Sequence, residues 1–458
     1  MLKNKKIIYP FSIIPLIIIL SLFGWFLIAI FEGEKPLIVL EPHPEFLSKG
    51  QKFTYSISDK RMGLKKLKVS VNQEGKEINL FEQEFPYKGL LNRKGVHRYE
   101  KELFIDPLLL DLAQGRADIN IHVWDYSRKS GGDGNHTLAQ HKMTVDTIPP
   151  AIRAISRMHN INMGGAGLVI YQASSDTEES GLFVDDIFSP GFPADGKTLK
   201  GVHVSYFTVP YNSSLKPSIY LWAKDRADNH SNATFYYHIR RKRFRNERME
   251  ITDRFLKRIL PYFSFYPLNP AESDIKKFIK INNGLRKENN HTLLKLGEKT
   301  SPKRLWQGPW LRLKNSATMA RFADHRSYYY KGKKFDEQVH LGIDLASLAN
   351  SPVQATNHGR IIFAERLGIY GLTVVLDHGQ GLASLYSHLS KIEVTPDQEV
   401  KKGDIIGLTG QTGLAGGDHL HFAIMVNGIF VSPIEWFDGH WIKDNITKKL
   451  ALVSGVTP

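Results

Sequence analysis

Apolar and polar residues alternate over two long stretches of the chain, which are separated by a segment of different character. In the stretch DINIHVWDYS, the residues Ile119, Ile121 and Val123 occupy every second position, and SIYLWAKDR repeats this pattern about one hundred residues later. Because successive side chains of a strand point to opposite faces, the alternation predicts strands with one buried face. The repeat and its turns therefore predict two β-sandwiches, in residues 32–150 and 151–240.

The segment between the two strand-rich stretches has a different period. From about residue 241 to 313, apolar residues recur at helical spacing, as Phe255, Leu256, Ile259 and Leu260 do. We expect a short helical connector here, which joins the β-sandwiches to a C-terminal domain.

Residues 314–446 are predicted to form that C-terminal domain, built on an antiparallel β-sheet, with a tail at 447–458. Short alternating runs are separated there by glycine turns, and VVLDHGQGLASLYSHL predicts a hairpin that turns at Asp377–Gly381. The expected protein is thus mostly β.

An uncharged apolar run occupies residues 7–31, which is long enough to cross a hydrocarbon core as one helix. Lysines precede the run and glutamates follow it, so the positive-inside rule keeps residues 1–6 in the cytoplasm. A cleavable signal peptide is the competing interpretation, but the run is longer than a usual signal sequence and lacks a small-x-small site. We expect an uncleaved single-span transmembrane helix in the bacterial inner membrane, with the later domains facing the periplasm or cell wall.

The composition of the chain limits the kinds of metal ligand and binding partner that we expect. The chain has 458 residues, a formal charge of +15 and no cysteine. The length suits several domains, and the lack of cysteine excludes disulfides and thiolate metal sites, which leaves nitrogen and oxygen ligands for any metal. Basic residues are concentrated in the N-terminal tail and in residues 240–334. We interpret them first as a solvated basic face, and attraction to anionic surfaces such as phospholipid head groups or wall polymers is the alternative. Because an exported chain rarely meets nucleic acid, no nucleic-acid partner is expected.

Acidic residues lie in several predicted turns of the β-sandwiches. Asp125, Asp133, Asp225 and Asp228 offer hard oxygen ligands of the kind that calcium binds. Turn aspartates more often accept hydrogen bonds from the backbone, and we interpret these four as turn residues.

The candidate chemistry lies near the C-terminus, in three short motifs that contain histidine: HLGID, LYSHL and GDHLHF. As strands, these motifs place His340 and Asp344 on one face, and His419 and His421 on one face, with apolar residues opposite. His388 lies on the polar face of the predicted hairpin. Two histidines and a carboxylate on a rigid sheet form a three-ligand site with an open fourth position, as catalytic zinc requires. Two histidines then remain for proton transfer.

These motifs resemble the lysostaphin-type, or LytM-like, zinc metallopeptidases, which cut peptide bonds in bacterial peptidoglycan. The matching elements are His340-x-x-x-Asp344, Gly359, Tyr370-Gly371, His378-Gly379, Tyr386-x-His388, Gly403-Asp404, Gly407-x-x-Gly410 and His419-x-His421-Phe422. The resemblance implies one Zn²⁺ per chain, bound by His340, Asp344 and His421. It also implies that His388 and His419 are a catalytic pair that orients water and moves protons.

Further resemblances concern the surroundings of this site and the β-sandwiches. Arg326, in ADHR, resembles the Phe-Gly-x-Arg element of the family. Family members often have a tyrosine near the first ligand, and Tyr328–Tyr330 lie upstream of it. The sandwiches resemble bacterial immunoglobulin-like modules, which share the Asp-Thr-x-Pro-Pro joint before residue 151 and the turn at Trp222–Asn229.

The expected function is hydrolysis of peptide cross-links in peptidoglycan by a membrane-anchored zinc endopeptidase, with the peptide stems as its substrate. The alternative is a non-catalytic wall-binding regulator, or an activator of another cell-wall hydrolase. Such regulators usually lack some of the ligands, whereas all five positions are filled here. A third interpretation, an adhesin or scaffold built on the sandwiches, has no ligand motif to support it. An activating protein partner is compatible with the first two interpretations.

Overall fold

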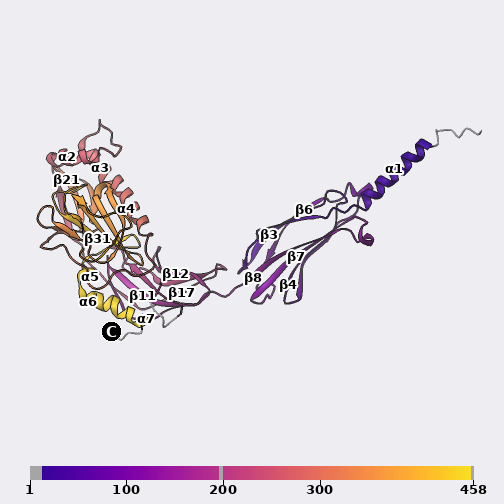
Figure 1. The fold of residues 1–458 in the computed structure, drawn as a ribbon, viewed down its shortest axis with the longest axis horizontal. Coiled ribbons are helices and arrows are strands. Elements are labelled where there is room, and N and C mark those ends of the chain that lie inside the picture. Colours follow the sequence, from indigo (N-terminus) through magenta and orange to yellow (C-terminus); the bar gives the residue numbers. More distant parts are fainter. Residues whose placement is uncertain (1–12, 195–199, 455–458) are drawn as a thin grey trace, which may run out of the picture. The chain divides into compact units, whose positions relative to one another are not determined.

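A computed structural model describes residues 13–194 and 200–454 of the chain (Figure 1). The protein is mostly β, as predicted. Contacts divide it into two compact units, which are residues 1–149 with 226–229 and residues 150–225 with 230–458.

The apolar N-terminal run forms helix α1 (Ile13–Ile30). Its large apolar side chains are exposed, among them Ile14, Phe23 and Ile28. Within the described part of the chain, no helix is both long and apolar enough to cross a membrane. The predicted tail at 1–6 and residues 7–12 of the predicted anchor lie outside the described residues.

After α1, the first unit consists of two sheets around one core. Its strands are β1 (Leu37–Glu41), β2 (Phe46–Leu47), β3 (Gln51–Ser58), β4 (Leu64–Gln73), β5 (Lys76–Glu84), β6 (Arg98–Ile105), β7 (Gly115–Asp125) and β8 (His136–Val145). One sheet has the order β1-β3-β6 and the other the order β2-β8-β7-β4-β5. Ile119, Ile121 and Val123 of β7 are buried in the core between them, as their alternation predicted.

The second unit begins with two further sheets, ordered β14-β15-β11-β9 and β13-β12-β16-β17, and a parallel pair, β10 and β18. The strands are β9 (Ile152–Ala154), β10 (His159–Asn162), β11 (Ala166–Ala173), β12 (Thr177–Val184), β13 (Ile187–Pro190), β14 (Phe192–Pro193), β15 (Val202–Thr208), β16 (Ile219–Asp225), β17 (His230–Ala233) and β18 (Tyr237–Arg240).

The segment predicted as a helical connector contains helices α2 (Asp253–Ile259), α3 (Asp274–Lys280) and α4 (Arg286–Leu296). It also contains a strand that the sequence analysis missed, β19 (Asn246–Glu250). This strand pairs in parallel with β21 (His325–Tyr330) of the C-terminal domain. Its side chains alternate between exposed and half-buried, but its many charged residues masked that pattern.

The C-terminal domain is built on a sheet of order β20-β23-β31-β27-β26-β25-β29, to which β32 is added beside β31. Two smaller sheets have the orders β19-β21-β22 and β24-β30-β28. The remaining elements are β20 (Ala317–Ala320), β22 (Lys333–Val339), β23 (Ile343–Ala346), β24 (Pro352–Gln354), β25 (Gly359–Leu367), β26 (Gly371–Gly379), β27 (Leu382–Leu389), β28 (Lys391–Ile392), β29 (Glu399–Val400), β30 (Ile405–Leu408), β31 (Leu420–Val426), β32 (Ile429–Val431), α5 (Ile434–Phe437), α6 (Gly439–Ile442) and α7 (Lys448–Ser454).

Strand β11 is buried on both faces and joins two cores. Val169 and Tyr171 face the core of their own sandwich, whereas Leu168 and Ile170 belong to the large core of the C-terminal domain. Hydrogen bonds reinforce this junction, including one from Lys449 Nζ to the Leu168 carbonyl oxygen at 2.9 Å. The uninterrupted apolar run LVIY is typical of a strand with two buried faces. The second sandwich and the C-terminal domain therefore share a core, although the sequence predicted a self-contained module.

This shared core predicts that a fragment starting at residue 305 is unstable by itself. Removing Leu168, Ile170 and their neighbours strips partners from the C-terminal core, and each buried apolar side chain contributes about 1.5–3 kcal/mol. The sum is comparable with the whole stability of a domain, about 5–15 kcal/mol. We expect circular dichroism melts to show a cooperative transition for residues 150–458 and a much lower or absent one for 305–458. Equal melting temperatures would contradict the shared core.

Candidate metal centre and active site

Three potential metal ligands come from neighbouring parts of the main sheet. Asp344 lies in β23 and His421 in β31, and the two residues are paired across the antiparallel strands. Directly opposite residues project from the same face, so their side chains meet. The prediction that one strand runs from His340 to Asp344 is wrong, because β22 ends at Val339 and β23 starts at Ile343. The bend between these strands still turns His340 toward Asp344.

The ligand atoms of these three residues form a compact triangle. His340 Nε2 and His421 Nδ1 both lie 2.9 Å from Asp344 Oδ1, and the two nitrogens are 2.9 Å apart. His340 Nδ1 lies 3.0 Å from the carbonyl oxygen of Arg321, to which it donates its proton, so Nε2 keeps a lone pair. All three side chains are buried. Two imidazole nitrogens and one carboxylate oxygen are a donor set that fits zinc.

Gly342 makes room for one of these ligands. A β-carbon at this position would lie 2.6 Å from His421 Cε1 and 2.7 Å from Nε2, so any side chain would push the ring out of place. The glycine between His340 and Asp344 therefore has a packing role.

His388 and His419 lie next to the triangle. Their ring centroids are 4.9 Å apart, and His419 Nε2 is 3.5 Å from Asp344 Oδ1. The Nδ1 atoms are held by backbone carbonyl oxygens, that of Thr412 for His388 at 2.7 Å and that of Gly417 for His419 at 2.8 Å. Because each Nδ1 donates its proton to a carbonyl, Nε2 is the atom of each ring that can exchange a proton with a bound molecule, and in His419 it lies beside the Asp344 carboxylate. All five residues that the sequence selected thus lie together.

A distortion of strand β27 aims His388. The pairs Leu372↔Leu389 and Val374↔Tyr386 enclose one residue on β26 but two on β27, which is a β-bulge. His388, inside the bulge, has a φ of 62°, in the left-handed region that few residues other than glycine adopt, with asparagine, aspartate and histidine the commonest of these. Bulges re-aim side chains, and such backbone strain is concentrated at functional sites.

The surroundings set the pKa values of the two histidines apart. Burial lowers the pKa of His388, and the nearby His419 and His421 lower it further, to well below the usual value. Burial also opposes the charged form of His419, but its contact with Asp344 and the charge of that carboxylate raise its pKa overall. Burial would raise the pKa of Asp344, yet His340 and the other histidines hold it well below the ordinary value. His388 is thus harder to protonate than a free imidazole, and His419 is easier to protonate.

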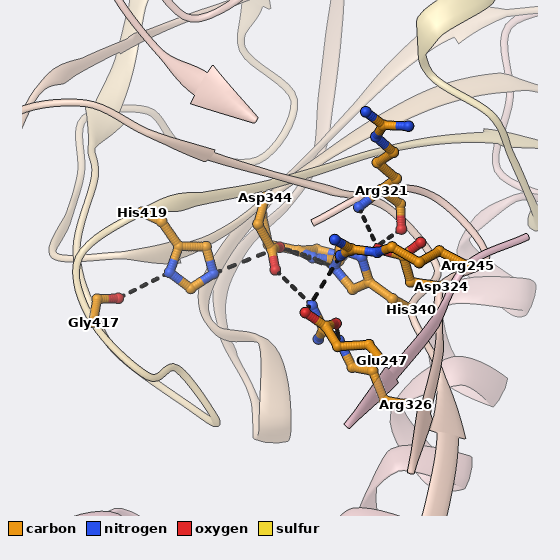
Figure 2. Close-up of polar contacts among 10 residues, drawn as sticks. Arg245, Glu247, Arg321, Asp324, Arg326, His340, Asp344, Gly417 and His419 are labelled. Atoms are coloured by element: carbon orange, nitrogen blue, oxygen red, sulfur yellow. Dashed lines mark hydrogen bonds and ion pairs between the residues drawn. The ribbon is translucent and has the colours of Figure 1, made fainter. Parts of the chain in front are cut away.

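Outside the triangle, a chain of charges fixes the carboxylate. Arg326 donates to Asp344 Oδ2 at 3.0 Å and to Glu247 Oε2 at 3.0 Å, as Figure 2 shows. Arg245 binds Asp324 at 2.7 Å beside it. Glu247 belongs to β19, so the sequence analysis missed it together with that strand. The sequence feature that could have revealed this strand is the alternation of the segment NERME, which places Glu247 on the half-buried face.

We expect the variant Glu247→Gln to lower zinc affinity by about 10- to 100-fold, as loss of an outer partner of a metal ligand does. Arg326 would lose its second carboxylate and hold Asp344 less firmly. Glu250→Gln is the matched control, since Glu250 lies in the same strand but is exposed. Zinc titration of both variants checks this expectation, and equal affinities would contradict it.

The tyrosines predicted near the first ligand have other contacts. Tyr328 packs in a small core with Phe278, and the Tyr330 hydroxyl donates to Asp253 at 2.7 Å. Tyr370 is the tyrosine beside the metal ligands, with its ring centroid 5.7 Å from that of His421. The resemblance had marked Tyr370 only as part of a Tyr-Gly turn, so its nearness to the site was missed.

Comparisons with known proteins agree with this geometry. Residues 338–433 match the family described as Peptidase family M23. The chain is 39% identical over 97 residues to the DD-carboxypeptidase/endopeptidase Mpg of Neisseria meningitidis serogroup B (strain MC58), which covers 21% of this chain and 22% of that protein. It is 38% identical over 89 residues to the peptidoglycan DD-endopeptidase ShyA of Vibrio cholerae, which covers 19% of this chain and 21% of ShyA.

A relative with a different described role also matches. The chain is 36% identical over 95 residues to the murein hydrolase activator EnvC of Escherichia coli (strain K12), which covers 21% of this chain and 23% of EnvC. The chain therefore aligns with less than a quarter of the length of these relatives.

Proposed function

Because the chain carries an M23 peptidase domain near its C-terminal end, we propose that it is a zinc endopeptidase that hydrolyses peptide cross-links of bacterial peptidoglycan. The observation that carries this proposal is the triangle of His340, Asp344 and His421, with edges of 2.9 Å, beside the paired rings of His388 and His419. The described activities of Mpg and ShyA support the substrate class.

One Zn²⁺ per chain would be held by His340, Asp344 and His421. When bound, zinc supplies a Lewis acid for the peptide carbonyl and makes water a nucleophile at neutral pH. Arg326 keeps the Asp344 carboxylate in position, since it binds the oxygen that does not face the histidines. The buried surroundings strengthen these charge interactions relative to water.

His388 and His419 would carry out the proton transfers. Cleavage of an amide needs one group that takes a proton from water and one that delivers a proton to the leaving amine. Each ring is fixed through Nδ1 by a backbone carbonyl oxygen, so Nε2 is the atom that receives or releases the proton. The short separation of the two rings supports a role for both at one bound peptide bond.

The N-terminal run is proposed to anchor the protein in the inner membrane, with the M23 domain in the periplasm and no nucleic-acid partner. The support is the uncharged sequence of residues 7–31 and the lysines before it. Deleting residues 1–31 is expected to move the protein from the membrane fraction to the soluble fraction after cell lysis. Retention of the shortened chain in carbonate-washed membranes would contradict the anchor.

The proposed function is tested by incubating the purified, zinc-loaded chain with isolated peptidoglycan and measuring the soluble fragments released. We expect release by the wild type and none after treatment with a chelator, with recovery on adding Zn²⁺. EnvC is described as a murein hydrolase activator. If this chain were such an activator, fragments would be released only when a second hydrolase is present. That result would replace the proposal by the regulatory alternative.

A further inference from the structure

The first unit contains a second cluster of potential metal ligands, far from the histidine motifs in the sequence. Glu32, Asp59 and Asp125 are 5%, 3% and 0% exposed, and one carboxylate oxygen of each lies within 4.8 Å of the others. Glu32 follows α1, Asp59 follows β3 and Asp125 ends β7. The cluster thus joins the segment after α1 to the two sheets of the first unit.

One oxygen in this cluster has no hydrogen-bond donor. Asp59 Oδ1 accepts from the backbone amides of Arg61 at 3.1 Å and Gly63 at 2.6 Å. Asp59 Oδ2 is buried and has no hydrogen-bond partner among the described residues. A buried carboxylate oxygen that lacks a partner is costly, unless a cation or a proton compensates for it.

Asn135 is the side-chain donor at the cluster. Backbone amides donate there too, that of Glu34 to Glu32 Oε2 at 2.7 Å and those of Ser127 and Asn135 to Asp125 Oδ1 at 2.9 Å and 2.7 Å. The Asn135 Nδ2 atom faces four oxygens, which are the Glu32 carbonyl at 3.2 Å, Glu32 Oε1 at 3.1 Å, the Glu34 carbonyl at 3.1 Å and Asp125 Oδ2 at 2.8 Å. An amide group has two protons to donate. The four oxygens around this amide therefore outnumber its two protons, and none of the backbone amides in the described part of the chain reaches Asp59 Oδ2.

Basic side chains do not balance the charge. Over the described residues, none of the three carboxylates forms an ion pair with Lys or Arg, and the neighbouring Arg61 pairs with Glu34 at 3.2 Å. Burial raises the pKa values of Glu32 and Asp59. Hydrogen bonds from the backbone amides of Glu34 and Gly63 act against this, and the charge of Asp125 adds to it.

We propose that Glu32, Asp59 and Asp125 bind a calcium ion, which fixes the segment after α1 to the two sheets of the first unit. Three carboxylates, with carbonyl oxygens beside them, match the hard, oxygen-only ligand set of Ca²⁺ and its irregular coordination. Mg²⁺ requires a near-ideal octahedron and retains several waters, which a buried cluster accommodates poorly. Zinc prefers nitrogen and sulfur, so the two proposed metal sites of the chain select different ions. The calcium site is independent of the proposed peptidase function.

Calcium titration of the full-length, zinc-loaded protein in detergent tests this proposal. We expect isothermal titration calorimetry to show one Ca²⁺ per chain with a Kd of about 10⁻⁴ to 10⁻³ M, the range of extracellular calcium modules. Excess Ca²⁺ should raise the melting temperature of the first unit by a few degrees, because a ligand that binds only the folded state stabilises it.

Two variants separate a calcium site from a structural cluster. Asp59→Asn should abolish both the calcium heat and the thermal shift, while Asp133→Asn, an exposed aspartate in the nearby turn, should retain them. Should Asp59→Asn fail to fold, the wild-type titration decides alone. Absence of binding and of a thermal shift at ~10 mM Ca²⁺, well above that range, would overturn the proposal and leave a shared proton as the compensating charge. An equal thermal shift with Mg²⁺ would overturn the choice of calcium.

Discussion

Replacing His421 by alanine is expected to abolish both zinc binding and cleavage of peptidoglycan. His421 Nδ1 is one corner of the 2.9 Å triangle, and its loss leaves two ligands, one fewer than a catalytic zinc site contains. Because the metal contributes several kcal/mol to the barrier reduction, the activity should fall by more than about 10³-fold.

The control for this variant is His440→Ala, which removes an exposed histidine of the same domain. Zinc content measured by atomic absorption should be one per chain in the wild type and in His440→Ala, and close to zero in His421→Ala. A His421→Ala protein that keeps its zinc and its activity would show that this triangle is not the metal centre.

Removal of either proton-transfer histidine is expected to reduce cleavage by about 10²- to 10⁴-fold without loss of zinc. His419→Ala removes a ring beside Asp344. For His388, asparagine is the better replacement, because it tolerates the left-handed backbone that the bulge imposes. Both variants should fold normally, since their rings bind only backbone carbonyl oxygens and the site itself.

Comparing zinc content with activity distinguishes a proton-transfer role of His388 and His419 from a structural role in the metal site. In His421→Ala both quantities fall, whereas in His388→Asn and His419→Ala only the rate falls. If the zinc content fell in parallel with the rate in all three variants, His388 and His419 would be supports of the metal site.

The candidate site could be predicted from short motifs because its residues obey local rules. His419 and His421 are two positions apart, and a strand pattern puts them on one face. Their grouping with Asp344 was implied by the family resemblance, because Asp344 lies opposite His421 only through the pairing of β23 with β31. The alternation of Ile119, Ile121 and Val123 likewise predicts the face of β7 that is buried. The alternation of side chains along a strand depends only on neighbouring residues, so it can be recognised in the sequence.

Features that depend on distant pairing could not be predicted. Glu247 reaches Asp344 through Arg326 only because β19 pairs with β21, some eighty residues later in the chain. Leu168 and Ile170 of β11 are buried against the C-terminal domain, and the spacing of residues within β11 does not show which domain covers this face. Similarly, Glu32 joins Asp59 and Asp125 only after the sheets have formed.

The measurement that tests the central claim most directly is mass spectrometry of the products formed from isolated peptidoglycan by the full-length, zinc-loaded protein. We expect cross-linked dimers to disappear and monomers to appear with a mass gain of one water per bond, whereas His421→Ala leaves the dimers intact. Persistence of the dimers in the presence of folded wild-type protein that holds its zinc would contradict the proposed endopeptidase.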